Sequence, residues 1–240
     1  VGEDQQDYFQ QVFATFDEMT DGKRPHLEHL NFGMIKLPEG KMSTRAGRVV
    51  FLEDVLNEAI DRARQKINEI NKNLPSEEKE IIAKQVGVGA VAFFDLGQDR
   101  ERSINFDWDK ALSFTGYSAP YIQYAHARMT ALLRRAEEEM VELRPDLSVK
   151  VTDQSEFLLI KQISKFPEAI ALAGAKNSPD IIAAHVYHTA SLFSDFYKQV
   201  SVFNEPDLSI RNTRLRLTQA AARVVKKGLN LLCIEAPERM

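Results

Sequence analysis

The chain has 240 residues, of which 44% are hydrophobic and 28% are charged, and its formal net charge is −4 at pH 7. This negative charge excludes a uniformly basic nucleic-acid binder, so any contact with RNA must come from local patches. Cys233 is the only cysteine, which excludes an internal disulfide and fits a reducing compartment. Apolar runs such as residues 90–94 are far shorter than the ~20 residues of a membrane span, so the sequence predicts no membrane segment.

The first 52 residues mix helical and strand patterns. They predict a helix near Gln5–Met19 and strands over Asn31–Leu37 and Arg48–Leu52. Between these two strands, residues 41–45 read Lys-Met-Ser-Thr-Arg. Cations on such a loop can neutralise polyphosphate during nucleotidyl transfer, because that chemistry depends on placed charge. The alternative is an ordinary solvated turn, in which Lys, Ser and Thr are also common.

Helical patterns dominate after residue 52. Apolar residues from Val55 to Ile70 recur at three- and four-residue steps, which predicts an amphipathic helix. The string Pro75-Ser76-Glu77-Glu78 predicts the start of another helix with Ser76 as its N-cap. Periodicity leaves both helix and strand open for residues 88–94. A turn at Asn105–Trp108 is expected to precede a short helix.

From about Phe114 the chain reads as entirely helical. One apolar stripe from Tyr121 to Met140 predicts a long helix that ends near Arg144-Pro145. Further helices are predicted at Ser155–Lys165, Pro167–Leu172, Pro179–Lys198 and Asp207–Lys227. Gly228 is expected to serve as the C-cap of the last helix. The predicted fold class is therefore mainly α, with a small αβ beginning.

A basic segment lies within the last predicted helix. Residues 209–233 contain no acidic residue and six cations, namely Arg211, Arg214, Arg216, Arg223, Lys226 and Lys227. On a helix, Arg216, Arg223 and Lys227 share one face. Such a stripe can bind phosphates without reading sequence, and a solvated helix face is the alternative.

Four strings together carry a family resemblance. Residues 41–45 resemble the KMSKS loop of class I aminoacyl-tRNA synthetases. Residues 1–10, with Val-Gly-Glu-Asp-Gln and Phe-Gln, look like a strand-to-helix segment of arginyl-tRNA synthetases. Residues 118–128 are similar to that family's PYxQYAHAR helix, and residues 228–240 resemble its ending at ERM. The chain is thereby identified as similar to the arginyl-tRNA synthetase family.

The resemblance implies two domains. Residues 1–113 are expected to be the C-terminal part of a class I nucleotide-binding α/β catalytic domain, and residues 114–240 an all-α anticodon-binding bundle. None of the five histidines sits in the HIGH-type motif that the class I fold requires. We therefore expect a C-terminal piece that is inactive alone.

The implied activity is that of an arginine–tRNA ligase. Such an enzyme activates arginine with ATP and transfers it to tRNA(Arg), with Mg²⁺ assisting in the full-length enzyme. The resemblance also implies a cytoplasmic monomer, and we expect no metal-binding residue in this part of the chain. The alternative is a non-catalytic helical RNA-binding module. The loop at residues 41–45 argues against that alternative, and a gene without a HIGH-containing half would favour it.

Catalytic roles follow from the matching positions. Lys41, Ser43 and Arg45 are expected to be catalytic, and ATP is expected to contact Lys41, Met42, Ser43 and Thr44. Thr44 stands where KMSKS has its second lysine, which leaves open whether Arg45 substitutes for it. Gln5 is expected to bind arginine, and Tyr8 stands where family members often have histidine.

The resemblance places anticodon recognition on the predicted bundle. Tyr124, Arg128, Tyr197 and Met240, the last with its carboxylate, are the expected contacts. Tyr124 and Arg128 are four residues apart and so share a helix face. Core packing of Tyr124 is the alternative. Gln123 and His126 are expected either to share in this site or to organise the interface between the two domains.

Overall fold

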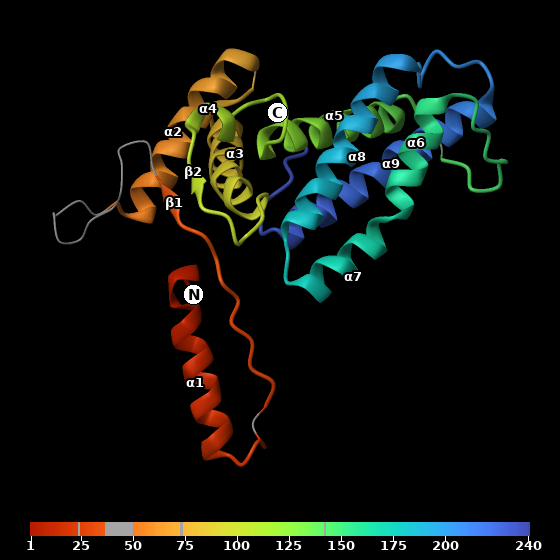
Figure 1. Ribbon diagram of the computed structural model, residues 1–240. Coiled ribbons are helices and arrows are strands. Elements are labelled where there is room, and N and C mark those ends of the chain that lie inside the picture. Colours follow the sequence, from red (N-terminus) through yellow and green to blue (C-terminus); the bar gives the residue numbers. More distant parts are fainter. Residues whose placement is uncertain (24, 37–49, 73, 142) are drawn as a thin grey trace. The chain divides into compact units, whose positions relative to one another are not determined.

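The computed structural model describes residues 1–23, 25–36, 50–72, 74–141 and 143–240. Two compact units are present, residues 1–49 with 98–107, and residues 50–97 with 108–240. Each unit has its own set of elements, and Figure 1 labels the α-helices and strands in chain order. Across the described ranges, no helix is both long enough and apolar enough to cross a membrane.

The first unit is small. It contains the 3-10 helix η1 (Glu3–Gln5), helix α1 (Gln6–Met19) and the short strands β1 (Ile35–Lys36) and β2 (Ile104–Asn105). The strands pair in parallel, with Ile35 opposite Ile104. The predicted helix near Gln5–Met19 is confirmed. Arg100 braces the unit, because its Nη1 donates to the backbone oxygen and the side-chain oxygen of Asn31, both at 2.6 Å.

The strand predictions were largely wrong in the described part of this region. Of the strand predicted over Asn31–Leu37, the described residues form a strand only at Ile35–Lys36, which lies beside β2, and Phe32 makes an isolated parallel bridge with Gly2. Residues before Ile35 do meet backbone neighbours, since the Phe32 N–H donates to the Val1 oxygen at 3.1 Å and the Gly33 N–H to the Arg100 oxygen at 2.7 Å, but these neighbours come from two different segments and form no continuous ladder. In the prediction over Arg48–Leu52, residues 50 and 51 are not strand, and Leu52 already begins a helix.

Every element of the second unit in the described residues is a helix. The unit contains α2 (Leu52–Ile70), α3 (Ser76–Leu96), α4 (Trp108–Ala111), α5 (Ala119–Glu138), α6 (Gln154–Ser164), α7 (Phe166–Lys176), α8 (Asp180–Gln199) and α9 (Leu208–Leu231). Figure 1 shows α2 beside α3, and α5, α6, α8 and α9 gathered into a bundle. Large side chains such as Phe93, Phe193 and Leu215 are fully buried in one core cluster. The mainly α prediction is confirmed, and residues 88–94 are helical.

Two helix ends differ from the prediction. α3 begins at Ser76 itself, so Pro75 and not Ser76 holds the N-cap position. α5 ends at Glu138, well before Arg144-Pro145. Met140 adopts a left-handed conformation with φ of 54°, which turns the chain out of the helix before the proline is reached.

Gly228 does not cap α9 as predicted. The helix continues to Leu231, and Gly228 is buried inside it. A Cβ at Gly228 would lie 2.1 Å from Cγ1 of Val186 on α8. The glycine is therefore required for the close approach of α8 and α9.

Gly228→Ala is expected to lower the free energy of unfolding by about 1–3 kcal/mol, because the added methyl overpacks the α8–α9 contact. Gly174→Ala is the matched control, since a Cβ there meets nothing within 4 Å. That control should stabilise α7 by about 0.4–1 kcal/mol. Urea denaturation of both variants measures the difference, and Val186→Ala should rescue Gly228→Ala. Equal stability of the two glycine variants would contradict the packing role.

Candidate nucleic-acid interface

Three of the predicted anticodon residues meet at one place between α5 and α8. Tyr124 and Arg128 lie one turn apart on α5, and Tyr197 comes from α8. The guanidinium carbon of Arg128 lies 4.9 Å from the centroid of the Tyr124 ring and 5.1 Å from that of Tyr197. Arg128 Nη2 also donates to Tyr124 Oη at 3.2 Å. Both rings therefore make cation–π contacts with one guanidinium.

None of these three side chains is part of the buried core. Tyr197 is 40% exposed, and Tyr124 and Arg128 are half-buried. The Phe114 and Tyr124 rings pack in a T-shaped arrangement, with ring centroids 6.4 Å apart. Partly exposed aromatic rings beside a cation suit the unstacked bases and phosphates of single-stranded RNA. Core packing alone therefore does not account for Tyr124, because its ring is half-buried and contacts the partly exposed Arg128.

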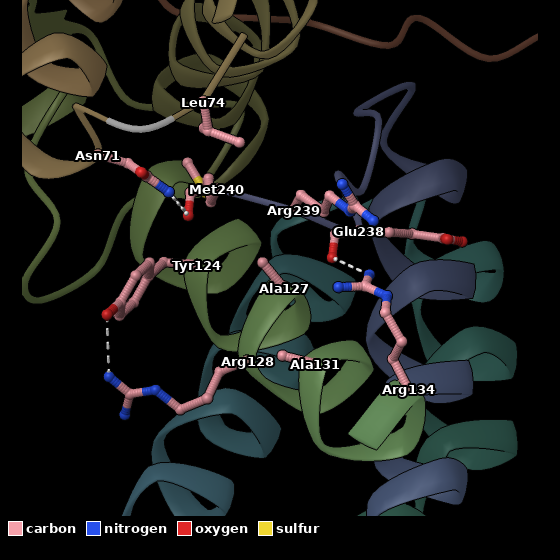
Figure 2. Close-up of a pocket in the computed structure, with 10 residues that line it drawn as sticks. All are labelled: Asn71, Leu74, Tyr124, Ala127, Arg128, Ala131, Arg134, Glu238, Arg239 and Met240. Atoms are coloured by element: carbon pink, nitrogen blue, oxygen red, sulfur yellow. Dashed lines mark hydrogen bonds between the residues drawn. The ribbon is translucent and has the colours of Figure 1, made fainter. Parts of the chain in front are cut away.

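Met240 joins the same place through a pocket of about 420 Å³ (Figure 2). The pocket is lined by one face of α5 with Tyr124 and Arg128, and by Met240. The turn between α2 and α3 contributes Asn71 and Leu74. Asn71 Nδ2 donates to the backbone oxygen of Met240 at 3.3 Å. The sequence reasoning missed Asn71 and Leu74, and no local pattern marks them.

A row of polar side chains on α5 holds the segment that leads to Met240. Gln123 Nε2 donates to the Glu235 oxygen at 2.8 Å, and His126 Nδ1 lies 2.9 Å from the Pro237 oxygen. One turn further along, Thr130 Oγ1 donates to the Glu238 oxygen at 2.8 Å. These contacts repeat at helical spacing, so α5 determines where residues 235–240 run. Arg134, which sequence reasoning also missed, donates to the Glu238 oxygen at 3.2 Å.

Gln123 and His126 are therefore structural residues of this unit. Gln123 also donates to the Gln85 oxygen at 3.1 Å, which ties α5 to α3. Burial lowers the pKa of His126, while the hydrogen bond to Pro237 opposes that shift. A carbonyl can only accept, so the neutral imidazole carries its proton on Nδ1.

The predicted arginine and ATP contacts belong to the first unit or lie outside the described residues. Gln5 ends η1 with an exposed side chain, and its backbone N–H donates to the Gly2 oxygen at 3.1 Å. Tyr8 is 61% exposed. Residues 41–45, which include the predicted contacts Lys41, Met42, Ser43, Thr44 and Arg45, lie outside the described residues.

One member of the predicted basic segment does not belong to a surface patch. Arg223, Lys226 and Lys227 are exposed on α9, and Lys226 pairs with Glu238 at 3.0 Å. Arg214 is only 6% exposed. Its Nε donates to Glu156 Oε1 at 2.6 Å, so a buried carboxylate neutralises it. The sequence prediction counted Arg214 as a surface cation because a charge alone does not reveal its partner.

Comparison with known families divides the chain in the same order as the predicted domains. The family "tRNA synthetases class I (R), catalytic domain" matches residues 1–108, and the family "DALR anticodon binding domain" matches residues 122–240. Among curated relatives, the arginine–tRNA ligase of Clostridium perfringens is 40% identical over 240 residues, covering 100% of this chain and 42% of that protein. The arginine–tRNA ligase of Chloroflexus aggregans is 42% identical over 234 residues, covering 97% of this chain and 41% of that protein.

Solved structures of arginyl-tRNA synthetases have a fold similar to that of this chain. Arginyl-tRNA synthetase of Thermus thermophilus superposes with a TM-score of 0.79 at 31% identity, covering 88% of this chain and 35% of that chain. The Plasmodium falciparum enzyme has the same fold, with a TM-score of 0.79 at 22% identity, covering 100% of this chain and 40% of that chain. The helical fold and the matches define part of a class I aminoacyl-tRNA synthetase with an anticodon-binding domain. The chain belongs to the arginyl-tRNA synthetase family, and it spans about two fifths of the length of its curated relatives.

Proposed function

We propose that this chain supplies anticodon recognition and the KMSKS-like loop of an arginine–tRNA ligase, which activates arginine with ATP and transfers it to tRNA(Arg). The observation that carries the proposal is the convergence of Tyr124, Arg128, Tyr197 and Met240 at one partly exposed site. That site lies in the region that matches the anticodon-binding family. The proposed domains are residues 1–113 and 114–240, a boundary supported by matches that end at residue 108 and begin at residue 122.

The catalytic roles in this proposal rest on sequence. Lys41, Ser43 and Arg45 act on the phosphates of ATP, with Met42 and Thr44 also at the nucleotide, and Gln5 binds arginine. The match of residues 1–108 to a catalytic domain supports these roles and disfavours a non-catalytic RNA-binding module. The proposed enzyme is a cytoplasmic monomer, and this part of it is inactive alone.

Mg²⁺ is not assigned to this part of the enzyme. Among the residues that the structure describes, no group of three or more His, Cys, Asp or Glu side chains could hold a metal ion. The donor set for Mg²⁺ is normally carboxylate oxygens together with substrate phosphates.

Tyr124→Ala is expected to weaken binding of tRNA(Arg) by about 1–3 kcal/mol, because a base loses its stacking partner. Tyr124→Phe keeps the ring and loses only the contact from Arg128 Nη2, so it should retain most of the affinity. Binding is measured at fixed salt with tRNA(Arg) and with a tRNA changed only in its anticodon. Circular dichroism and urea denaturation show whether each variant folds. A folded Tyr124→Ala variant with full affinity, or equal binding of both tRNAs by the unaltered chain, would contradict anticodon reading.

A further inference from the structure

The face of α5 that carries Tyr124 and Arg128 continues to a second planar cation. Arg135 lies eleven residues after Tyr124, about 16 Å along the helix axis at the usual rise. Its guanidinium carbon is 4.1 Å from the centroid of the Phe203 ring. Its Nε donates to Glu139 Oε1 at 2.6 Å, and its side chain remains 56% exposed. The ring beneath and the carboxylate at the edge thus fix a guanidinium plane that still faces solvent.

Arg135 lies in a groove of about 450 Å³ that begins at the anticodon cluster. The end of α8 contributes Tyr197 and Lys198 to the groove, and the loop before α9 contributes Phe203. Tyr197 also contacts Arg128, so the two sites share a side chain. The groove therefore extends the same surface, and Lys198 adds a positive charge to it.

The loop that forms one wall of the groove is anchored from below. Arg214 Nη1 donates to the backbone oxygen of Ser201 at 2.7 Å and to Glu205 Oε2 at 2.9 Å. Ser201 Oγ in turn accepts from the backbone N–H of Asn204 at 3.2 Å. Both ends of the short segment around Phe203 are thereby held by a buried cation. Because the Phe203 ring already holds the Arg135 side chain, less conformational entropy is lost when a ligand stacks on the Arg135 guanidinium.

We propose that Arg135, stacked on Phe203, is a second base-stacking platform, which takes another unpaired nucleotide of the same anticodon loop. A base stacks on a guanidinium plane much as it does on an aromatic ring. Lys198 neutralises the neighbouring phosphate, and Tyr197 connects this nucleotide with the one bound beside Tyr124 and Arg128. This inference rests on the proposed function, since it needs a single-stranded loop at the Tyr124 site.

The test combines a variant with a base deletion in the RNA. The probe is the anticodon stem-loop of tRNA(Arg), intact or with a single abasic nucleotide at each loop position in turn. Arg135→Lys keeps the charge and removes the planar stack, so it should lower affinity for the intact loop by roughly 5-fold or more. Removing the base at one loop position, other than the position that stacks on Tyr124, should lower the affinity of the unaltered chain as much as Arg135→Lys does. Arg135→Lys should bind that abasic RNA no more weakly than it binds the intact one.

Arg62→Lys is the matched control. Arg62 also stacks on a ring, that of Trp108 at 5.0 Å, and pairs with Glu58 at 2.6 Å. It lies on α2, far from the loop between α8 and α9 within the same unit (Figure 1). Arg62→Lys should leave affinity for the stem-loop unchanged. Phe203→Leu removes the ring beneath Arg135 and should reproduce the effect of Arg135→Lys, with urea denaturation confirming that both variants fold.

Two results would overturn the platform. The first is unchanged affinity in folded Arg135→Lys and Phe203→Leu variants. The second is the same affinity for every abasic RNA, because a platform that stacks one base requires one loop position to matter more than the others. If Tyr124→Ala still weakens binding in either case, the proposed function stands and only this inference fails. If Tyr124→Ala also leaves the affinity unchanged, the proposed anticodon site is contradicted as well.

Discussion

Arg214→Met is expected to lower the free energy of unfolding by about 3–5 kcal/mol. Glu156 is fully buried and Glu205 is 18% exposed, and both carboxylates face the Arg214 guanidinium. Removing the cation leaves the buried Glu156 carboxylate with only the backbone N–H groups of Thr152 and Asp153 as partners and no positive charge beside it, which costs more than the pair contributes when intact. The backbone oxygen of Ser201 loses its donor as well. The loss should therefore exceed that of an ordinary surface ion pair several-fold.

Urea denaturation with a matched surface variant measures this effect. Lys150 pairs with Asp207 at 2.8 Å, and both side chains are more than a third exposed. Lys150→Met should cost only about 0–1 kcal/mol, because water screens the exposed pair. Arg214→Met combined with Glu156→Gln should recover part of the loss, since the buried charge is then absent while an amide oxygen can still accept from the backbone N–H groups of Thr152 and Asp153. Equal costs for Arg214→Met and Lys150→Met would show that the buried network does not stabilise the bundle.

The helices could be predicted from sequence because their signals are local. Apolar side chains at three- and four-residue spacing located both ends of α2 and the start of α5 within a few residues, although α5 ends earlier than predicted. The Tyr124–Arg128 pair could also be predicted, because a spacing of four fixes a shared face. Arg135 falls on that same face, and the periodicity alone could have found it.

The residues that sequence reasoning misassigned depend on partners far away in the chain. Gly228 looks like a helix cap until Val186 is placed against it, and Arg214 looks like a surface cation until Glu156 is placed beneath it. Asn71 is separated by 169 positions from Met240, to which it donates. Periodicity reports which face a residue occupies and carries no information on what packs against that face.

Lys41→Ala, in an enzyme that carries the whole catalytic domain, is expected to slow formation of arginyl-adenylate by about 10²–10³-fold. Negative charge gathers on the departing pyrophosphate only as the reaction proceeds, so the cation acts mainly on the transition state. Affinity for tRNA(Arg) should change little, because the proposed anticodon contacts lie elsewhere in the sequence. Lys41 lies outside the described residues. The prediction rests on the KMSKS-like string and on the match of residues 1–108.

Pyrophosphate exchange in the presence of tRNA(Arg) measures this step, and Lys23→Ala serves as a lysine control outside the loop. Thr44 occupies the place of the second KMSKS lysine, so the neighbouring Arg45 provides a second comparison. If Arg45 supplies the missing cation, Arg45→Ala should slow exchange, and adding Thr44→Lys to that variant should restore part of the rate. An unchanged rate of pyrophosphate exchange in Lys41→Ala would contradict the catalytic role proposed for the loop. Loss in Lys41→Ala without loss in Arg45→Ala would mean that one cation in this loop is enough for the charge on pyrophosphate.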